Sequence, residues 1–328
     1  MRHLAPKLHP ILSGGSAIRV PASGGRIPGL IDAPAFTLSA PPQLRLPVLV
    51  AVPHAGRAYP PAVLARMRDP DLAQLRLEDR HVDRLGVEIA RQTGAALLVS
   101  HAPRALLDLN RADDDIDWDM IDGGRPEGTA PANAVQGGNR RARSGLGLVP
   151  RRLPGSGEIW RGRLDPGELG DRIDGIHTAY HAALADTLAR IRSEWGAALL
   201  IDLHSMPPLK PAEGEARAPV IVLGDRFGAA CHSLLMGRAL THLEVRGCPA
   251  AQNRPYSGGY VLDRHGAPHS SVHAMQVEVC RTTYLDRRLA EPGPGLPAMA
   301  TLLAGLVREL GAETALVGGG EGFMQAAE

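Results

Sequence analysis

The stretch Leu200-Ile201-Asp202-Leu203-His204-Ser205 decides the fold class of this chain. It closes an apolar run, residues 197–203, that is typical of a strand buried in a parallel sheet. Ligands of such sheets bind beyond the carboxyl ends of the strands. His204 is therefore expected to face a crevice, where Asp202 can orient its imidazole, as a catalytic zinc site requires. For an isolated motif of this kind, a strand-end histidine bonded to nearby backbone is the more common arrangement.

The composition is that of an ordinary globular protein. The chain has 328 residues, of which 44% are hydrophobic and 22% charged, enough for one large α/β domain or two small ones. A net charge of +1 argues against a nucleic-acid partner. The three cysteines form no CxxC pair, so they indicate neither a disulfide framework nor a cysteine zinc site. No stretch reaches the roughly 18 apolar residues of a membrane span, so we expect a cytoplasmic protein without a membrane partner.

Alternating strand and helix patterns predict a single α/β domain. Residues 1–34 are rich in Pro, Gly and Ser and are expected to form a flexible arm before a domain at 35–328. Residues 113–153, with three consecutive aspartates and several glycines, are expected to form a long active-site loop region. Helices on both faces of a mixed, mostly parallel sheet would give three α/β/α layers. The expected strands are 47–52, 95–100, 197–203, 219–223 and 275–279, and the expected helices are 82–93, 169–195, 227–245 and 298–310.

Two histidines at strand ends predict a metal site. His54 follows the first strand of the domain as His204 ends a later one, and neighbouring strands lie only about 5 Å apart. Zinc held by two histidines and a carboxylate keeps a position open for water. The segment 78–83 offers Asp83 as the favoured third ligand and Asp79 as the alternative. Both carboxylates lie in or before the first turn of a helix, where they could equally serve as caps.

Glu278 is the candidate general base. The alternating strand pattern around it places Gln276 on the same face. A glutamate buried in an apolar strand needs a partner or a role, because burial disfavours its charged form. Beside a zinc-activated water, Glu278 could accept a proton and pass it to the leaving nitrogen. The structural alternative is an ion pair with Arg281 or another arginine.

Asn110 and Arg111 are candidates for binding a substrate carboxylate. They follow a buried run, and a guanidinium can clamp a carboxylate by two-point contact while an amide adds hydrogen bonds. The alternative for Arg111 is a surface ion pair with the acidic run 113–115.

A turn-rich loop at 253–260 is the second candidate substrate segment. Its Gly258 and Gly259 would permit close approach of the backbone to a ligand, although a plain reverse turn has the same composition. The remaining candidate substrate residues are Tyr256, Arg143 and Arg264.

Taken together, these segments resemble the N-formylglutamate amidohydrolase (N-formylglutamate deformylase) family over about residues 36 to 310. The matching pieces are VPHAGRAYP at 52–60, EDRHVDRL at 78–85, DLNR at 108–111, GLGLVPR at 145–151, Tyr180-His181, DLHSMP at 202–207, RPYSGGYV at 254–261 and HAMQVEVCRTTYLD at 273–286. The family is related to the zinc carboxypeptidases, so the resemblance implies a phosphorylase/hydrolase-like fold of the zinc-exopeptidase type.

The resemblance also implies roles for individual residues. In the carboxypeptidases, pieces similar to Asn110-Arg111, Asp202-x-His204-Ser205 and Glu278 act as carboxylate binder, zinc ligand and general base. This sequence departs from their pattern at Arg57, which stands where a carboxypeptidase has a glutamate ligand. The departure is the reason why Asp83 and Asp79 compete for the third position.

The activity implied by the resemblance is zinc-dependent hydrolysis of N-formyl-L-glutamate to glutamate and formate, as in histidine degradation. One zinc ion, or another divalent metal, would be held by His54, Asp83 and His204, with Glu278 as base and Arg111 on the oxyanion or a substrate carboxylate. One alternative is a carboxypeptidase-like or deacylase enzyme acting on another N-acyl amino acid or short peptide. Another is a non-catalytic protein that binds metal or carboxylate. The expected partner is a small N-acyl acidic amino acid, and the expected state is a monomer or homodimer.

Overall fold

A mixed sheet of eight strands runs through the centre of the protein, in the order β1-β2-β4-β3-β7-β10-β8-β9. The computed structural model describes residues 20–127, 141–142, 144–153, 155–211, 213 and 217–324. The central strands β4, β3, β7 and β10 are parallel, whereas β1 and β2 on one side and β8 on the other run antiparallel to their inner neighbours. The strands are β1 (Val20–Gly24), β2 (Phe36–Ala40), β3 (Val48–Val52), β4 (Ala96–Ser100), β7 (Ala198–Met206), β8 (Ile221–Gly224), β9 (Ala250–Gln252) and β10 (Val272–Cys280).

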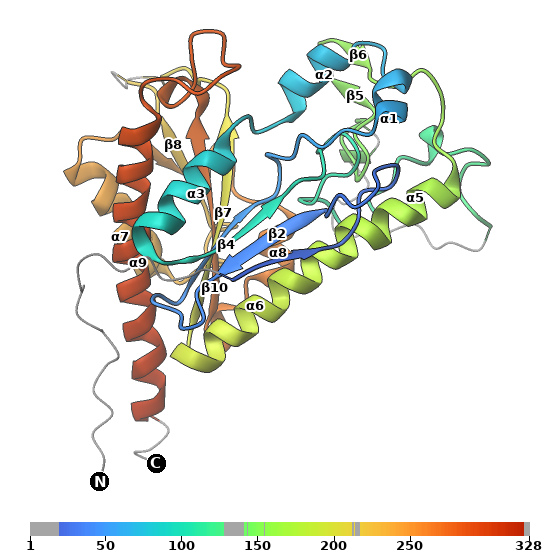
Figure 1. Ribbon diagram of the computed structural model, residues 1–328. Coiled ribbons are helices and arrows are strands. Elements are labelled where there is room, and N and C mark those ends of the chain that lie inside the picture. The colour runs from blue at the N-terminus through green and yellow to red at the C-terminus, as the bar shows by residue number, and fades with distance from the viewer. Residues whose placement is uncertain are drawn as a thin grey trace.

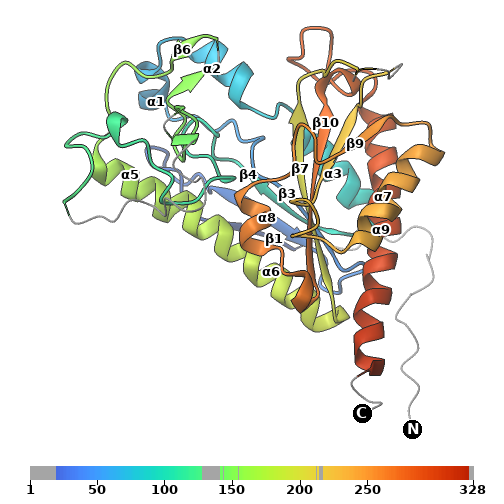
Figure 2. The ribbon, with the colours of Figure 1, turned by 180° about the vertical axis from the view of Figure 1, so that it is seen from behind.

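Helices cover both faces of this sheet (Figure 1). One face carries α3 (Val82–Thr93), α7 (Ser233–Val245) and α9 (Leu296–Met324). The other carries α6 (Ala179–Trp195) and α8 (Tyr260–His265), which Figure 2 shows from behind. The predicted three-layer α/β/α architecture with a mostly parallel mixed sheet is therefore confirmed.

The position of β7 in the middle of the sheet explains why its sequence is apolar almost throughout. Leu199, Ile201 and Leu203 pack against α3, α7 and α9 on one face, while Leu200 belongs to the cluster under α6 on the other. A strand covered on both faces needs apolar side chains at every position, until it reaches a functional end. In β7 this end begins at Asp202.

Several short elements lie beyond the amino-terminal end of α6. The helices α1 (Pro61–Arg66), α2 (Pro70–Leu77) and α5 (Pro166–Arg172) lie there with the two-stranded ribbon of β5 (Arg152–Leu153) and β6 (Gly157–Glu158) (Figure 1). The backbone of Arg68 donates to Ile159 O at 2.8 Å and ties the α1–α2 segment to the ribbon. The 3-10 helix η1 (Trp118–Met120) and the ribbon strand β5 belong to the predicted loop region 113–153, of which residues 128–140 and 143 lie outside the described residues.

Several boundaries differ from the sequence predictions. Residues 20–24, expected within the flexible arm, instead form edge strand β1, which is held by antiparallel pairing with β2; residues 1–19 lie outside the described residues. The helix expected at 227–245 begins only at Ser233, because Arg226 and Phe227 have positive φ angles of 55° and 56°. Strand β7 continues to Met206, so His204 lies inside the strand near its end.

The helix expected at 169–195 is three consecutive segments. The α5 helix runs into the π-helix η2 (Ile173–Thr178), which continues as α6. Within the described part of the chain, no helix combines the length and apolar character that crossing a membrane requires.

Candidate active site

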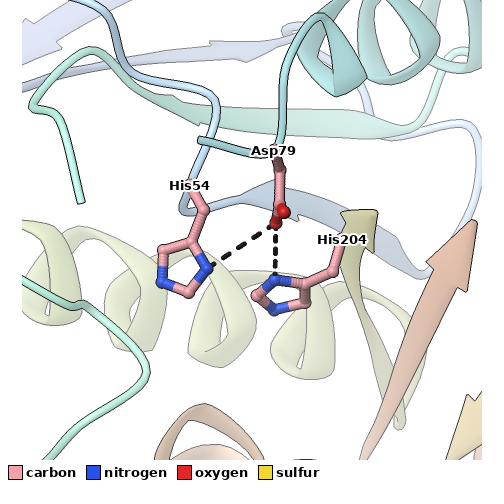
Figure 3. A group of neighbouring side chains, drawn as sticks. All are labelled: His54, Asp79 and His204. Carbon is pink, nitrogen blue, oxygen red and sulfur yellow. Dashed lines mark hydrogen bonds and ion pairs between the residues drawn. The ribbon is translucent and has the colours of Figure 1, made fainter. Parts of the chain in front are cut away.

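Three buried side chains meet at the carboxyl ends of β3 and β7. His54, Asp79 and His204 offer nitrogen and oxygen atoms that all lie within 4.8 Å of one another. The Asp79 Oδ2 atom is 3.0 Å from His204 Nδ1 and 3.6 Å from His54 Nδ1. Figure 3 shows the carboxylate pointing between the two rings. We refer to these residues as the His-Asp-His group.

Each histidine of the group is held from behind by a further carboxylate. His54 Nε2 lies 2.8 Å from Asp108 Oδ1, and His204 Nε2 lies 2.9 Å from Asp202 Oδ2. A carboxylate can only accept, so Nε2 of each ring carries the proton. The contact between His204 and Asp202 agrees with the sequence prediction that Asp202 orients this ring. His204 Nδ1 also lies within hydrogen-bond distance of Asp79 Oδ2, so without a metal this ring donates from both nitrogens, and a bound cation would take the place of the Nδ1 proton.

A tight turn before α3 brings Asp79 to the histidines. The Asp79 backbone N–H donates to His54 O at 2.9 Å, and its side chain accepts from Ser205 Oγ at 3.1 Å. Arg281 reinforces the turn, since it donates to Glu78 O at 2.6 Å and to Ser205 Oγ at 3.1 Å. Arg281 therefore stabilises the Asp79 turn. The ion pair between Arg281 and Glu278, which was the structural alternative for Glu278, is not formed among the described residues.

Asp83, the favoured third ligand, is not part of the group. It lies in the first turn of α3, and its two carboxylate oxygens accept from Arg57 at 3.3 and 2.9 Å. The side chain of Asp83 is 24% exposed, whereas that of Asp79 is 4% exposed. The structure places Asp79 rather than Asp83 beside the histidines, because the chain reaches His54 in the turn before the helix, one helical turn earlier than the favoured position.

The electrostatics of the group favour a bound cation. Burial disfavours the charge of Asp79, but the neighbouring imidazoles of His204 and His54 hold the pKa of Asp79 well below its usual range. Burial also disfavours an imidazolium, yet Asp202 and Asp79 raise the pKa of His204 well above its usual range. The surrounding carboxylates therefore create a strongly negative environment at the two rings.

The group fits a zinc ion. His54 Nδ1 is buried and has no hydrogen-bond partner among the described residues, although a buried polar atom is normally satisfied. Two imidazole nitrogens and one carboxylate oxygen are a common ligand set of catalytic zinc, and they leave a coordination position open. Carboxylates behind both rings are the usual supporting partners of zinc-binding histidines.

Glu278 lies next to the group on the neighbouring strand. In the parallel pairing of β10 with β7, Glu278 is in register with His204 and Gln276 with Asp202. Gln276 Nε2 donates to Glu278 Oε1 at 2.8 Å, which confirms the predicted shared face. Burial raises the pKa of Glu278 to about 7, although the charge of His204 opposes the shift. A carboxyl with a pKa near neutrality is suited to both accepting and returning a proton.

Asn110 and Arg111 lie in a loop fixed by backbone contacts. Arg111 Nε donates to Leu146 O at 2.9 Å and its Nη1 to Asn110 O at 2.7 Å, so that Nη2 is without a hydrogen bond among the described residues. Asn110 Oδ1 accepts from the backbone N–H of Val261 at 3.0 Å. Among the described residues, Arg111 thus bonds to backbone carbonyls and pairs with Asp108 at 3.9 Å rather than with the acidic run 113–115.

Arg104 is a residue of this region that the sequence analysis missed. Its Nε and Nη2 donate to Asp108 Oδ2 at 3.0 and 2.9 Å. Burial disfavours its charge, but the carboxylates of Asp108, Asp79 and Glu278 raise the pKa of Arg104. A permanent cation thus faces the same carboxylates as the His-Asp-His group. The sequence gives no pattern around position 104, and only its spacing of four residues before Asp108 hints at the pair.

The loop at 253–260 approaches protein groups closely. A Cβ atom at Gly259 would lie 2.6 Å from Asn110 Oδ1, so glycine is needed for this contact. Gly258 has a φ of 98°, in the region that favours glycine. Tyr256 packs with Met206, Val222 and Cys280, and Val222 is the partner of Glu278 in the pairing of β8 with β10.

Arg264 and Arg143 remain predictions as substrate binders. The guanidinium of Arg264 lies 5.7 Å from the centre of the Tyr260 ring and donates to its hydroxyl at 2.5 Å. Arg143 lies outside the described residues.

The fold and the site define the class: a three-layer α/β protein with a buried His-Asp-His group at the carboxyl edge of parallel strands. The chain belongs to the N-formylglutamate amidohydrolase family, whose sequence model matches residues 46–285. Similar curated proteins are N-formylglutamate deformylases from Pseudomonas aeruginosa, 31% identical, and Pseudomonas putida, 30% identical. Each match covers 74% of this chain and 84% of the relative.

Solved structures agree with this assignment. The crystal structure of N-formylglutamate amidohydrolase from Ralstonia eutropha JMP134 is 28% identical and superposes with a TM-score of 0.74 over 85% of this chain and 98% of that chain. A gene product from Agrobacterium tumefaciens, 15% identical, has the same fold, with a TM-score of 0.60 over 84% of this chain and 93% of its own.

Proposed function

We propose that this protein is a zinc-dependent amidohydrolase that hydrolyses N-formyl-L-glutamate to glutamate and formate. The similarity to curated N-formylglutamate deformylases supports the substrate. The observation that carries the reaction type is the register of β7 and β10, which sets Glu278 directly beside His204 of the His-Asp-His group. A proton-accepting carboxyl beside a ligand set for zinc is the arrangement that metal-assisted hydrolysis needs.

The proposed metal ligands are His54, Asp79 and His204. Zinc held there would lower the pKa of a water molecule and polarise the formyl carbonyl of the substrate. Asp108 and Asp202 keep the Nε2 protons of the two histidines in place, so that each Nδ1 presents its lone pair.

Glu278 moves the proton in this proposal. It removes a proton from the attacking water as the new C–O bond forms at the formyl carbon. It then returns the proton to the amide nitrogen as the C–N bond breaks, which releases formate and the amine of glutamate. Gln276 holds Oε1 of Glu278 throughout, so that Oε2 is the oxygen that accepts the proton.

Arginine side chains supply the positive charges that the substrate requires. Arg111 Nη2 and the amide of Asn110 would bind a carboxylate of the substrate, because the other donors of Arg111 are already fixed. Arg104, held by Asp108 through Nε and Nη2, would direct Nη1 toward the oxyanion that develops during attack. Arg264 remains a further proposed binder for the second carboxylate.

Metal removal and restoration test the proposal. Dialysis against a chelator should abolish hydrolysis of N-formyl-L-glutamate, and zinc should restore it. Full activity of the metal-free protein would contradict the proposal. A panel with N-acetyl-L-glutamate and short peptides separates it from the alternative, since faster turnover of either would indicate a deacylase or carboxypeptidase-like enzyme. A role in histidine degradation, a cytoplasmic location and a monomeric or homodimeric state stay predictions.

A further inference from the structure

Three buried histidines form a second cluster, on the side of the sheet covered by α6. His177, in the π-helix η2, and His181, in α6, have ring centres 4.3 Å apart. His265, at the end of α8, stacks on His181 with ring centres 5.2 Å apart and an angle of 12° between the planes. The exposed fractions of the three residues are 1%, 0% and 8%. We call these residues the histidine cluster.

The histidine cluster bonds to the backbone of the loop that carries Asn110 and Arg111. His181 Nε2 lies 3.0 Å from Leu109 O, and His177 Nε2 lies 2.9 Å from Arg111 O. The carbonyl between them, Asn110 O, accepts from Arg111 Nη1 at 2.7 Å. Three successive carbonyl oxygens of the loop therefore each have a side-chain donor, and two of the donors are histidines.

These contacts fix the tautomer of each ring. A carbonyl oxygen can only accept, so Nε2 of both His177 and His181 must carry a proton. His181 Nδ1 is 2.9 Å from His265 Nε2. In neutral rings, Nδ1 of His181 accepts and Nε2 of His265 donates. His181 thus needs a donor and an acceptor on opposite sides of one rigid ring, which a neutral imidazole supplies.

The surroundings keep the cluster neutral. Burial, with the neighbouring imidazoles of His177 and His265 and the charge of Arg264, lowers the pKa of His181 to about 2. Burial and the charge of Arg264 lower the pKa of His265 to about 4. At neutral pH, the hydrogen bonds from the rings to the loop are therefore intact.

The cluster also joins the loop to α8. His265 at the end of α8 donates to His181, while Val261 near its start donates to Asn110 Oδ1. The Asn110–Arg111 segment is thus held both by α6 and by α8. The π-helix η2 carries His177, and such local widening of a helix occurs frequently at functional sites. This supports a functional role for the histidine cluster.

We propose that His177 and His181 are positioning residues that set the backbone of Asn110 and Arg111 for binding a substrate carboxylate. This inference rests on the proposed function, because it assigns these two loop residues to the substrate. It predicts that loss of either ring affects substrate binding more than the chemical step, since Glu278 and the His-Asp-His group have no hydrogen bond with the cluster among the described residues.

Steady-state kinetics of the zinc-loaded full chain test the inference. The variants His181→Phe and His177→Phe should each raise KM for N-formyl-L-glutamate about 10-fold, the order expected when one buried hydrogen bond is lost, with kcat within about twofold. His181→Gln and His177→Gln retain an N–H donor and should recover most of the loss. All four variants should retain zinc as measured by atomic absorption.

A buried histidine on the other face of the sheet provides the matched control. His242 in α7 bonds to Glu309 at 2.7 Å and to Leu302 O at 3.3 Å, between α7 and α9. His242→Phe should lower the melting temperature and leave KM unchanged. If His181→Phe does not fold, His177→Phe provides the same test.

The possible outcomes distinguish the proposed function from the positioning role of the two histidines. A zinc-loaded wild type that does not hydrolyse N-formyl-L-glutamate overturns the proposed function. An active wild type whose folded phenylalanine variants keep the normal KM, or lose kcat instead, overturns the positioning role alone. Glutamine variants that behave like the phenylalanine variants also contradict it, because a donor at that position would then be irrelevant.

Discussion

The two groups of buried histidines differ chiefly in what surrounds their rings. His54 and His204 are backed by the carboxylates of Asp108 and Asp202 and face a third, that of Asp79. The rings of the histidine cluster bond instead to backbone carbonyls and to one another.

The charges in the two places have opposite consequences for the imidazole. Despite burial, carboxylates raise the pKa of His204 well above its usual range. Burial, with the neighbouring imidazoles and the charge of Arg264, lowers the pKa of His181 to about 2. An imidazole among carboxylates is thus suited to bind a cation, whereas an imidazole bonded only to carbonyls and other rings is suited to act as a neutral donor and acceptor.

Removing the carboxylate that lies between His54 and His204 is the strongest test of the difference between the two groups of histidines. We expect Asp79→Asn to lose zinc and to reduce deformylase activity to background, because an amide is a much weaker zinc ligand than a carboxylate. Asp83→Asn is the matched control, since Asp83 pairs with Arg57 outside the group. Zinc content by atomic absorption should fall only in the first variant; equal loss in both would contradict the assignment of Asp79.

Removing the proton acceptor should leave the metal in place and stop the chemistry. Glu278→Gln is expected to lower kcat by about 10²–10⁴-fold with an unchanged zinc content, because its amide cannot accept the proton of water. Glu88→Gln, on the exposed ion pair with Arg91, should have no effect. A Glu278→Gln variant with normal kcat would exclude Glu278 as the base.

The pH dependence of the reaction should reflect the same carboxyl. Because burial raises the pKa of Glu278 to about 7, the base is protonated below this pH and ionised above it. A zinc ion bound beside it would favour the ionised form, so we expect kcat/KM of the zinc-loaded enzyme to fall as the pH decreases below about 7. A rate that stays constant down to pH 5 in the zinc-loaded enzyme would show that another group accepts the proton.

The supporting carboxylates should have a smaller effect than the ligands. Asp202→Asn removes the charge behind His204 while keeping a similar shape, and we expect zinc affinity to fall about 10–100-fold. Competition with a chromogenic chelator measures this change. An unchanged affinity would mean that the carboxylate behind the ring does not distinguish the His-Asp-His group from the histidine cluster.

The smallest expected effect concerns stability. The pKa of Glu278 in the folded protein is about 7, above the ordinary glutamate value of 4.5, so the unfolded chain ionises first and the folded state loses stability as the pH rises from about 4.5 to 7. Glu278→Gln should therefore stabilise the metal-free protein by about 3 kcal/mol at pH 8 and by less at pH 5. Chemical denaturation at both pH values measures the difference, and an equal gain at both would contradict the assigned pKa.

Much of the fold could be predicted because local patterns specify it. The amphipathic run of α3 has the predicted bounds, since Gly94 ends the helix with a φ of 77°. The apolar run before Asp202 identified β7 as a central strand. Strand β1 escaped prediction because its sequence, VPASG, has little strand propensity and its pairing with β2 holds it in the sheet.

The site was harder to predict where distant contacts determine it. The sequence could identify His54, His204 and Glu278 because each lies at or near the end of an apolar strand. The choice between Asp79 and Asp83 depends on the backbone bond from Asp79 to His54 O, which no local pattern encodes. Tyr180-His181 was noted as part of the family resemblance, but the bond between His181 and His265 joins residues 84 positions apart, so no local pattern indicated that they form a cluster.

Anomalous diffraction at the zinc edge, from crystals of the zinc-loaded protein, tests the central claim most directly. If His54, Asp79 and His204 bind zinc, we expect one strong peak about 2.0–2.2 Å from His54 Nδ1, His204 Nδ1 and an Asp79 carboxylate oxygen. A peak beside Asp83, or zinc bound away from both histidines, would contradict it.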